Sequence, residues 1–318
     1  MTSTQRRVVR TITRLFGAGP KDGERHCEVN GPESPPLPDG RTVRLGNRGE
    51  TFVRELAGPP GSVPVVLLHG WGLTADTNFV DVYEKLSDRH RVIAPDVRMH
   101  GRASRAGGFT LTDAGDDVIA LLNALEIDRA ILCGYSMGGG IAADVVSRYP
   151  ERVAGTVISG TAACYTERWR DRILFLSLKA LRPLTAAGID PHPSPLLLMV
   201  TSRHSRISAE RRRWARRELA RNSLSDVLSV GLHIPTVDLR PRLARATRRP
   251  CEYLLLACDR LCHPQMQHEL AELLGAHICS LDKDHDVPIN DPLRFAEAVG
   301  GAVDRLDDQL ASGRSLPA

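Results

Sequence analysis

The stretch that decides the fold of this 318-residue sequence is Gly134-Tyr135-Ser136-Met137-Gly138. It follows an apolar run at Ala130–Cys133 that predicts a buried strand, and it opens a helical pattern over Met137–Tyr149. A G-x-S-x-G pattern between a strand and a helix is typical of a sharp turn that presents the serine hydroxyl as a nucleophile. Glycine-rich turns of this kind also bind phosphate, but no P-loop lysine follows and the spacing is not G-x-G-x-x-G. The sequence therefore predicts Ser136 as a nucleophile.

Further apolar runs have the character of parallel strands that are covered on both faces. They lie at Val63–Leu68, Val92–Ala94, Gly155–Ile158, Tyr253–Ala257 and His277–Leu281. Helical patterns alternate with them, at Leu111–Leu125, Gln265–Leu274 and Pro292–Leu306. A short hairpin is expected ahead of them, from Thr42–Leu45 and Thr51–Leu56. This alternation predicts an α/β protein with a mostly parallel, doubly wound sheet.

The alternation of strands and helices is interrupted over residues 161–246, which contain no buried-strand run. We expect this segment to form a helical cap over Ser136, with Trp169 and the apolar stretch Ile173–Leu184 lining or backing the pocket. The predicted division is a basic N-terminal arm and linker (1–40), a core (41–160 and 247–308), a helical cap (161–246) and a C-terminal tail (309–318).

Composition restricts the class of protein. The net charge is only +4, and 42% of the residues are hydrophobic and 25% charged, so a soluble globular protein is expected rather than a nucleic-acid binder. No apolar run reaches the roughly 18–20 residues of a membrane span. The seven cysteines are odd in number and scattered, which argues against a disulfide framework or a thiolate zinc site and favours the cytoplasm. Cys258, Cys262 and His263 lie close together in sequence, but buried thiols explain them without a metal.

Several motifs taken together resemble the α/β-hydrolase superfamily over residues 41–160 and 247–308. They are His69-Gly70-Trp71-Gly72, Asp96-Val97-Arg98-Met99-His100-Gly101-Arg102, the serine motif, Asp259 after a late strand and His285 after the next. The resemblance implies an oxyanion hole formed by the backbone N–H groups of Met137 and Trp71. It also implies that no metal or organic cofactor is needed. Relatives usually carry glycine where this chain has Met99, so the turn around Met99 is expected to differ.

The order of the catalytic residues in this fold is serine, acid, histidine. Asp259 ends an apolar run, where such sheets place their ligands, and is predicted as the acid. His285 lies between the final strand and the final helix and is predicted as the base. The neighbouring Asp282, Asp284 and Asp286 leave an alternative open, since one of them could replace Asp259. By contrast, His69 is interpreted as a structural histidine that holds its loop.

The expected activity is hydrolysis of a small carboxylic ester or thioester through an acyl-serine intermediate. The alternatives are C–C bond hydrolysis or cofactor-free perhydrolysis on the same three residues, and a ligand-binding protein with little turnover. The segment Arg203–Arg221 contains eight arginines. It is interpreted either as a solvated helix face or as a basic rim that makes weak contact with an acidic membrane surface. The sequence predicts neither the physiological substrate nor the oligomeric state.

Overall fold

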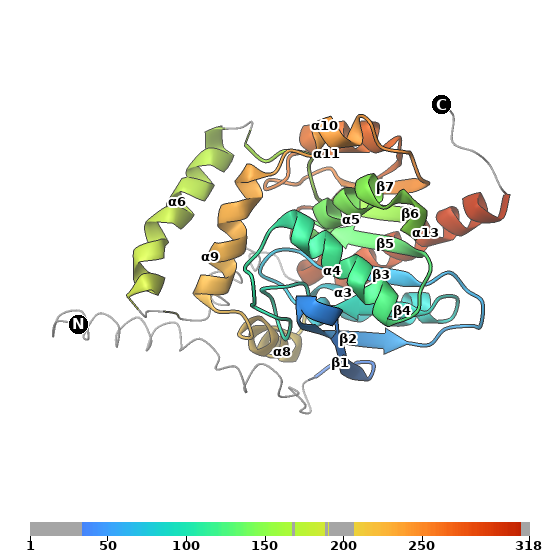
Figure 1. Ribbon diagram of the computed structural model, residues 1–318, viewed down its shortest axis with the longest axis horizontal. Helices are drawn as coiled ribbons and strands as arrows, with labels where there is room; N and C mark the ends of the chain where they lie inside the picture. The colour runs from blue at the N-terminus through green and yellow to red at the C-terminus, as the bar shows by residue number, and fades with distance from the viewer. Residues whose placement is uncertain (1–33, 167–168, 188–189, 191–206, 313–318) are drawn as a thin grey trace.

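A computed structural model describes residues 34–166, 169–187, 190 and 207–312 of the chain (Figure 1). Most of the predicted N-terminal arm, Arg203 and Arg206 therefore lie outside the described residues. Eight strands form one sheet in the order β1-β2-β4-β3-β5-β6-β7-β8. They are β1 (Gly40–Arg44), β2 (Glu50–Leu56), β3 (Val65–Leu68), β4 (Val92–Pro95), β5 (Ala130–Tyr135), β6 (Val153–Ser159), β7 (Cys251–Leu256) and β8 (His277–Leu281).

The sheet confirms the predicted mostly parallel architecture. The strands from β3 to β8 pair in parallel, while β1 and β2 form the expected antiparallel hairpin and β2 also runs antiparallel to β4. Parallel pairing brings the carboxyl ends of β3, β5, β7 and β8 to the same edge of the sheet. The loops that follow these strands therefore approach one another there, as expected for a ligand site in such a sheet.

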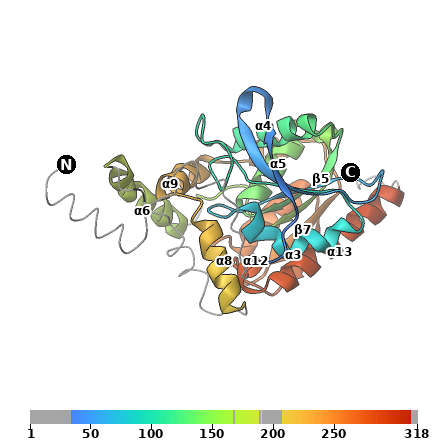
Figure 2. The same cartoon turned by 90° about the horizontal axis from the view of Figure 1, so that it is seen from below.

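Helices cover both faces of the sheet (Figures 1 and 2). The helices are α3 (Ala75–Ser87), α4 (Leu111–Ala124), α5 (Met137–Arg148), α6 (Trp169–Ala186), α8 (Ala209–Leu219), α9 (Leu224–His233), α10 (Arg240–Leu243), α11 (Pro264–Leu274), α12 (Val287–Asn290) and α13 (Pro292–Ser312). One apolar cluster joins the sheet to α4, α5 and α11, and a second joins it to α3 and α13.

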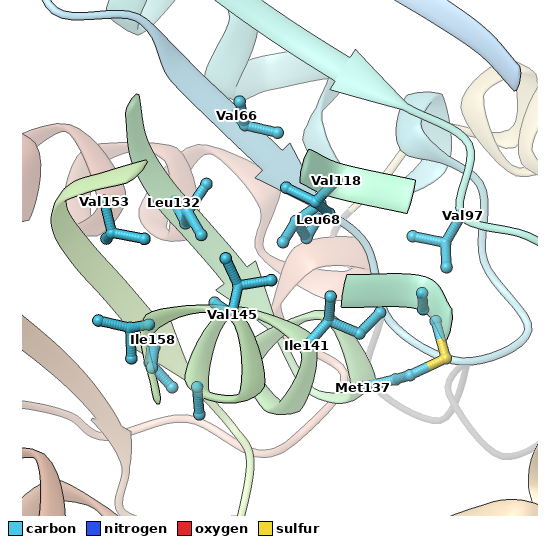
Figure 3. Close-up of a cluster of buried hydrophobic side chains, with 14 of the residues drawn as sticks. Val66, Leu68, Val97, Val118, Leu132, Met137, Ile141, Val145, Val153 and Ile158 are labelled. Atoms are coloured by element: carbon cyan, nitrogen blue, oxygen red, sulfur yellow. The ribbon is translucent and has the colours of Figure 1, made fainter. Parts of the chain in front are cut away.

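Each strand of the sheet interior contributes to both clusters because successive side chains point to opposite faces. In β3, Val66 and Leu68 belong to the cluster with α4 and α5, whereas Val65 and Leu67 belong to the cluster with α3 and α13. Figure 3 shows Val66 and Leu68 on the side of Ile141. This double burial explains why the strand sequences are continuously apolar rather than alternating.

The apolar pattern predicts no helix between Leu68 and Val92, yet α3 lies there. Thr74 caps this helix, since its hydroxyl accepts the Thr77 N–H at 3.2 Å and the Thr77 hydroxyl accepts the Thr74 N–H at 2.9 Å. Its first turn buries Asp76 and Asn78, two polar residues that are normally exposed. These residues interrupt the apolar periodicity, which is why sequence reasoning missed the helix.

The described part of residues 161–246, hereafter the inserted segment, contains α6, α8, α9 and α10 and no strand of the main sheet. Figure 1 shows α6 and α9 side by side beyond the sheet, and contacts between these two helices bear this out. At the other end of the chain, α13 continues to Ser312 and so extends into residues 309–318, where a tail is expected. Within the described ranges, no helix combines the length and the apolar character needed to cross a membrane.

Candidate active site

Ser136 lies in a strained turn between β5 and α5. Its φ of 53° and ψ of −120° are rare for a residue with a side chain. The turn is held by the Ser136 N–H, which donates to the Ser159 carbonyl at 2.9 Å. A Cβ atom at Gly138 would overlap the Leu68 carbonyl, and one at Gly134 would overlap the Gly138 carbonyl. The two glycines of the motif are therefore needed for β5, β3 and α5 to approach closely around the serine.

The structure brings together the three residues predicted as nucleophile, base and acid. The Nε2 atom of His285 lies 3.0 Å from the Ser136 hydroxyl, and its Nδ1 atom lies 2.8 Å from a carboxylate oxygen of Asp259. Because Nδ1 faces a carboxylate, it carries the proton, and Nε2 is left to accept the proton of the serine. The imidazole thus lies between an acceptor and a donor in the arrangement that general-base catalysis requires.

The Asp259 carboxylate is held on both oxygens and is 2% exposed. Its Oδ1 atom accepts the Leu261 and Cys262 N–H groups at 2.9 and 2.7 Å. Its Oδ2 atom accepts the Gln267 amide at 3.2 Å in addition to His285. These donors compensate for burial of the charge and fix the direction in which it faces the imidazole.

The other carboxylates near His285 face different partners. Asp282 contacts the thiol of Cys258, and Asp286 accepts the side-chain amide of Asn290. Asp284 accepts the backbone N–H groups of Arg260 and His285. Burial alone would raise the pKa of Asp284, but these hydrogen bonds and the Arg260 charge outweigh it and hold that pKa below its usual value. Among the four candidates, the one whose carboxylate meets the His285 ring is therefore Asp259.

Tyr135 is a site residue that sequence reasoning missed, although it lies within the serine motif. Its hydroxyl donates to the backbone carbonyl of His285, and its ring lies 5.3 Å from the imidazole, centre to centre. Burial raises the pKa of Tyr135 well above its ordinary value, so the hydroxyl remains a donor. The only signal in the sequence is an aromatic residue directly before the serine.

The loop after β3 passes beside Ser136. A Cβ atom at Gly70 would come within 3.4 Å of the Ser136 Cβ atom, so this loop lies in direct contact with the turn. In the part of the chain that the structure describes, the backbone N–H groups of Trp71 and Met137 donate to no protein acceptor. Both residues border the same cavity as Ser136 and His285. Two free donors beside a serine hydroxyl are what an oxyanion hole requires.

His69 is fully buried, and both its ring nitrogens are occupied. Its Nε2 atom accepts the Val97 N–H at 2.8 Å, so Nδ1 carries the proton and donates to the Gly70 carbonyl at 2.9 Å. Burial lowers the pKa of His69, although Asp96 opposes this effect, and the ring is neutral. Nearby, Met99 adopts the left-handed φ of 65° that a glycine would take more easily. The turn therefore takes a glycine-like conformation despite its methionine.

A cavity of about 50 Å³ opens beside Ser136. Its lining is mainly apolar and includes Trp71, Phe109, Leu111, Met137, Phe175 and Val237. His233 of α9 also lines it, and its Nε2 atom accepts the Leu111 N–H at 3.1 Å. Burial lowers the pKa of His233 despite the Asp113 charge, so a neutral imidazole completes the wall.

The predicted Ile173–Leu184 stretch contributes Phe175, whereas Ile173 and Leu176 are exposed. The Trp169 side chain lies outside the described residues.

Comparison with known proteins identifies the fold of this chain. A model of the α/β hydrolase fold matches residues 63–195. A bromoperoxidase from Bacillus anthracis superposes with a TM-score of 0.71 at 19% identity, over 84% of this chain and 100% of that one. A thermophilic esterase from Thermogutta terrifontis superposes with a TM-score of 0.68 at 20% identity, over 84% and 99% of the two chains.

The chain has the α/β-hydrolase fold. A curated relative, a non-heme chloroperoxidase of Streptomyces lividans, is 42% identical over 119 residues, which are 37% of this chain and 43% of that protein. The chain spans less than half the length of the curated relatives that it matches. The solved structures share the α/β-hydrolase fold with this chain.

The other polar residues that the sequence singled out contact groups of the protein itself. Cys262 is a buried thiol, as expected, and borders the cavity, whereas Cys258 is exposed. The His263 ring accepts the Gln265 N–H at the start of α11. Among the described residues, no group of histidine, cysteine and carboxylate side chains could hold a metal ion. In the segment Arg203–Arg221, Arg221 pairs with Glu218 at 2.8 Å and Arg211 pairs with Asp81 at 2.5 Å. These two arginines thus bind carboxylates of the protein itself.

Proposed function

We propose that the protein is a serine hydrolase that cleaves a carboxylic ester or thioester through an acyl-serine intermediate. The observation that carries this proposal is the line of contacts from the Ser136 hydroxyl through His285 to Asp259, at 3.0 and 2.8 Å. A serine hydroxyl is a weak nucleophile unless a base takes its proton as it attacks. Here the base is already within reach of that proton, and a buried carboxylate orients the base.

The first half of the proposed reaction acylates the serine. The Ser136 oxygen attacks the carbonyl carbon of the substrate while its proton passes to Nε2 of His285. The carbonyl oxygen gains a negative charge, which the free N–H groups of Trp71 and Met137 stabilise. The imidazolium is stabilised by Asp259 and returns its proton to the leaving alcohol or thiol, whose bond to the carbonyl carbon breaks.

The second half releases the acid. A water molecule gives a proton to His285 and attacks the acyl-serine carbonyl, again with the oxyanion between the two N–H groups. The bond to Ser136 breaks, and the serine oxygen recovers its proton from the imidazolium. Every proton transfer uses the one imidazole, so no metal or organic cofactor enters the scheme.

The cavity supports a short, apolar acyl group. A dry cavity of about 150 Å³ accommodates the six carbon atoms of benzene, so a space a third of that size encloses roughly two carbon atoms, and the end of a longer chain lies outside it. The cavity beside Ser136 is about 50 Å³ and is lined mainly by apolar side chains. Acetyl to butyryl esters are therefore the favoured substrates, and long acyl chains require the walls to move.

Cofactor-free perhydrolysis is the second candidate. The relative from Streptomyces lividans is called a non-heme chloroperoxidase, which favours this reaction over C–C bond hydrolysis. It differs from ester hydrolysis only in the last step, in which hydrogen peroxide replaces water and the acyl group leaves as a peroxy acid. The same Ser136, His285 and oxyanion donors perform both reactions.

A fluorophosphonate probe and a series of p-nitrophenyl esters test the proposal. The wild-type protein should be labelled and should hydrolyse the acetyl to butyryl esters. Ser136→Ala should abolish labelling and lower kcat by at least about a thousandfold, since the nucleophile is lost. Peroxy acid formed from acetate and hydrogen peroxide, without ester hydrolysis, would favour the second candidate. A wild-type protein that is inert in every assay, yet is stabilised thermally by small molecules, would favour a binding protein.

A further inference from the structure

The inserted segment contacts the loop that carries Trp71. The Trp71 indole N–H donates to the Val227 carbonyl of α9 at 2.9 Å. The ring lies against Gly231 of the same helix, where a Cβ atom would overlap the Cζ2 atom of the indole. An alanine at this position would therefore displace the ring. Trp71, which borders the cavity, thus has its side chain fixed by α9.

A second contact comes from Asn222, which lies between α8 and α9. Its amide donates to the Gly72 carbonyl at 3.0 Å and accepts the Gly101 N–H at 2.8 Å. Asn222 is 0% exposed, so both hydrogen bonds are shielded from water and neither partner has a solvent alternative. The carbonyl that it holds belongs to the residue directly after Trp71. By holding the Gly72 carbonyl, Asn222 restricts the backbone angles that set the direction of the Trp71 N–H.

The segment before Asn222 is fixed to the core as well. Glu218 of α8 pairs with Arg102 at 3.1 Å, and both side chains are buried. Gly70, on the other side of Trp71, donates its N–H to the Asn78 side chain of α3 at 2.9 Å. The loop is thus held by α3 on one side and by the inserted segment on the other.

We propose that Asn222 and Gly231 are positioning residues for the oxyanion hole, so that the inserted segment sets catalytic rate as well as access to the cavity. This inference rests on the proposed function. In this arrangement α9 and Asn222 hold the Trp71 N–H toward the developing oxyanion, together with the His69 hydrogen bond to the Gly70 carbonyl of the same peptide unit. A displaced Trp71 loop weakens transition-state binding and leaves the Ser136–His285–Asp259 contacts unchanged.

Two variants test the proposal. Asn222→Asp keeps the size of the side chain but replaces the donor to Gly72 with an acceptor. Gly231→Ala adds one methyl group against Trp71, in a helix where alanine is the better helix former. Each should lower kcat by about 10- to 100-fold, below the full loss of one oxyanion donor. KM should change less than about twofold and the fluorophosphonate labelling rate should fall in parallel with kcat, as expected when only transition-state binding is lost.

Matched controls and a double variant separate this role from a structural one. Asn123→Asp, at an exposed position of α4, and Gly301→Ala on α13, where a Cβ atom meets only one side-chain atom at 3.6 Å, should keep wild-type kcat. Trp71→Phe removes the indole atoms that a methyl group at position 231 would meet first, and leaves only its weaker overlap with Leu178 at 2.9 Å. Adding Gly231→Ala to Trp71→Phe should therefore cost much less than adding it to the wild type.

The outcomes distinguish this inference from the proposed function. Wild-type kcat in both test variants, or a loss that follows only the unfolded fraction measured by circular dichroism, would overturn the positioning role. An equal cost of Gly231→Ala in the wild type and in the Trp71→Phe variant would overturn it too. A wild-type protein that neither reacts with the probe nor hydrolyses any ester would overturn the proposed function itself, and the positioning role with it.

Discussion

Arg102 and Glu218 form a buried ion pair of 3.1 Å that joins the turn after β4 to α8, with each side chain 1% exposed. The pair belongs to a larger set of buried charges, because Arg102 also binds Asp76 and Asp96 at 3.0 and 3.2 Å. Glu218 in turn binds Arg221 at 2.8 Å. Alternating charges of this kind compensate one another, and removal of one leaves another buried without its partner.

Glu218→Gln should destabilise the protein by about 3–5 kcal/mol, since Arg102 and Arg221 would lose a shared counter-charge in a dry environment. Urea unfolding followed by circular dichroism measures the change. The control is Glu210→Gln, which removes an exposed pair with Arg213 at 3.3 Å and should cost at most about 1 kcal/mol. Equal effects of the two substitutions would show that the buried network adds nothing to stability.

Asp259→Asn should lower kcat by about 10⁴-fold without unfolding the protein, because the amide favours the wrong tautomer of His285. Asp284→Asn is the comparison, since its carboxylate binds the Arg260 and His285 backbone rather than the imidazole. Ester hydrolysis and melting temperature are measured for both variants. A greater loss of kcat in Asp284→Asn than in Asp259→Asn would mean that Asp284 is the acid.

Acid should destabilise the protein through His100. Burial lowers the pKa of this histidine to about 3, and the neighbouring His69 contributes to the same shift. An unfolded histidine takes up a proton near pH 6.5, so protons favour the unfolded chain as pH falls from about 6.5 toward 3. His100 thus contributes stability that is fully present above about pH 6.5 and is lost as pH falls below it.

The measurement is urea unfolding at about pH 7 and about pH 4.5. His100→Asn should reduce the difference in unfolding free energy between these conditions by up to about 2–3 kcal/mol, even if it destabilises the protein at both. His268→Asn, on the exposed face of α11, is the control and should leave the difference unchanged. A wild-type pH dependence in His100→Asn would exclude His100 as the source.

Phe175→Ala should widen the range of acyl chains. The Phe175 side chain comes from α6 and lines the cavity, so its removal adds space next to Ser136. Relative to p-nitrophenyl acetate, the kcat/KM for the hexanoyl and octanoyl p-nitrophenyl esters should rise at least about tenfold. This rise corresponds to an energy within the roughly 1–3 kcal/mol that a pocket contact contributes to discrimination. Leu176→Ala, 60% exposed on the same helix, should leave the profile unchanged. No change in Phe175→Ala would mean that the acyl group binds elsewhere.

Much of the fold could be predicted from the sequence because its signals are local. A buried parallel strand requires a continuous apolar run, and the runs at β3 to β7 are of this kind. The serine turn is encoded in five consecutive residues, since Gly134 and Gly138 are needed only to let neighbouring backbones approach. Helix α3 could not be predicted in this way, because buried Asp76 and Asn78 interrupt its apolar face and their partners lie in other elements of the chain.

Neighbouring residues in the chain were enough to predict the turn around Ser136 and the order in which acid and base follow it. The choice among four carboxylates for contact with the His285 ring depended instead on packing, because it follows from the path of two loops after β7 and β8. The same is true of Asn222 and Gly231, which reach the Trp71 loop from more than a hundred residues away. Local geometry can be read from neighbouring residues, whereas a contact between distant loops exists only once the sheet and the inserted segment have packed.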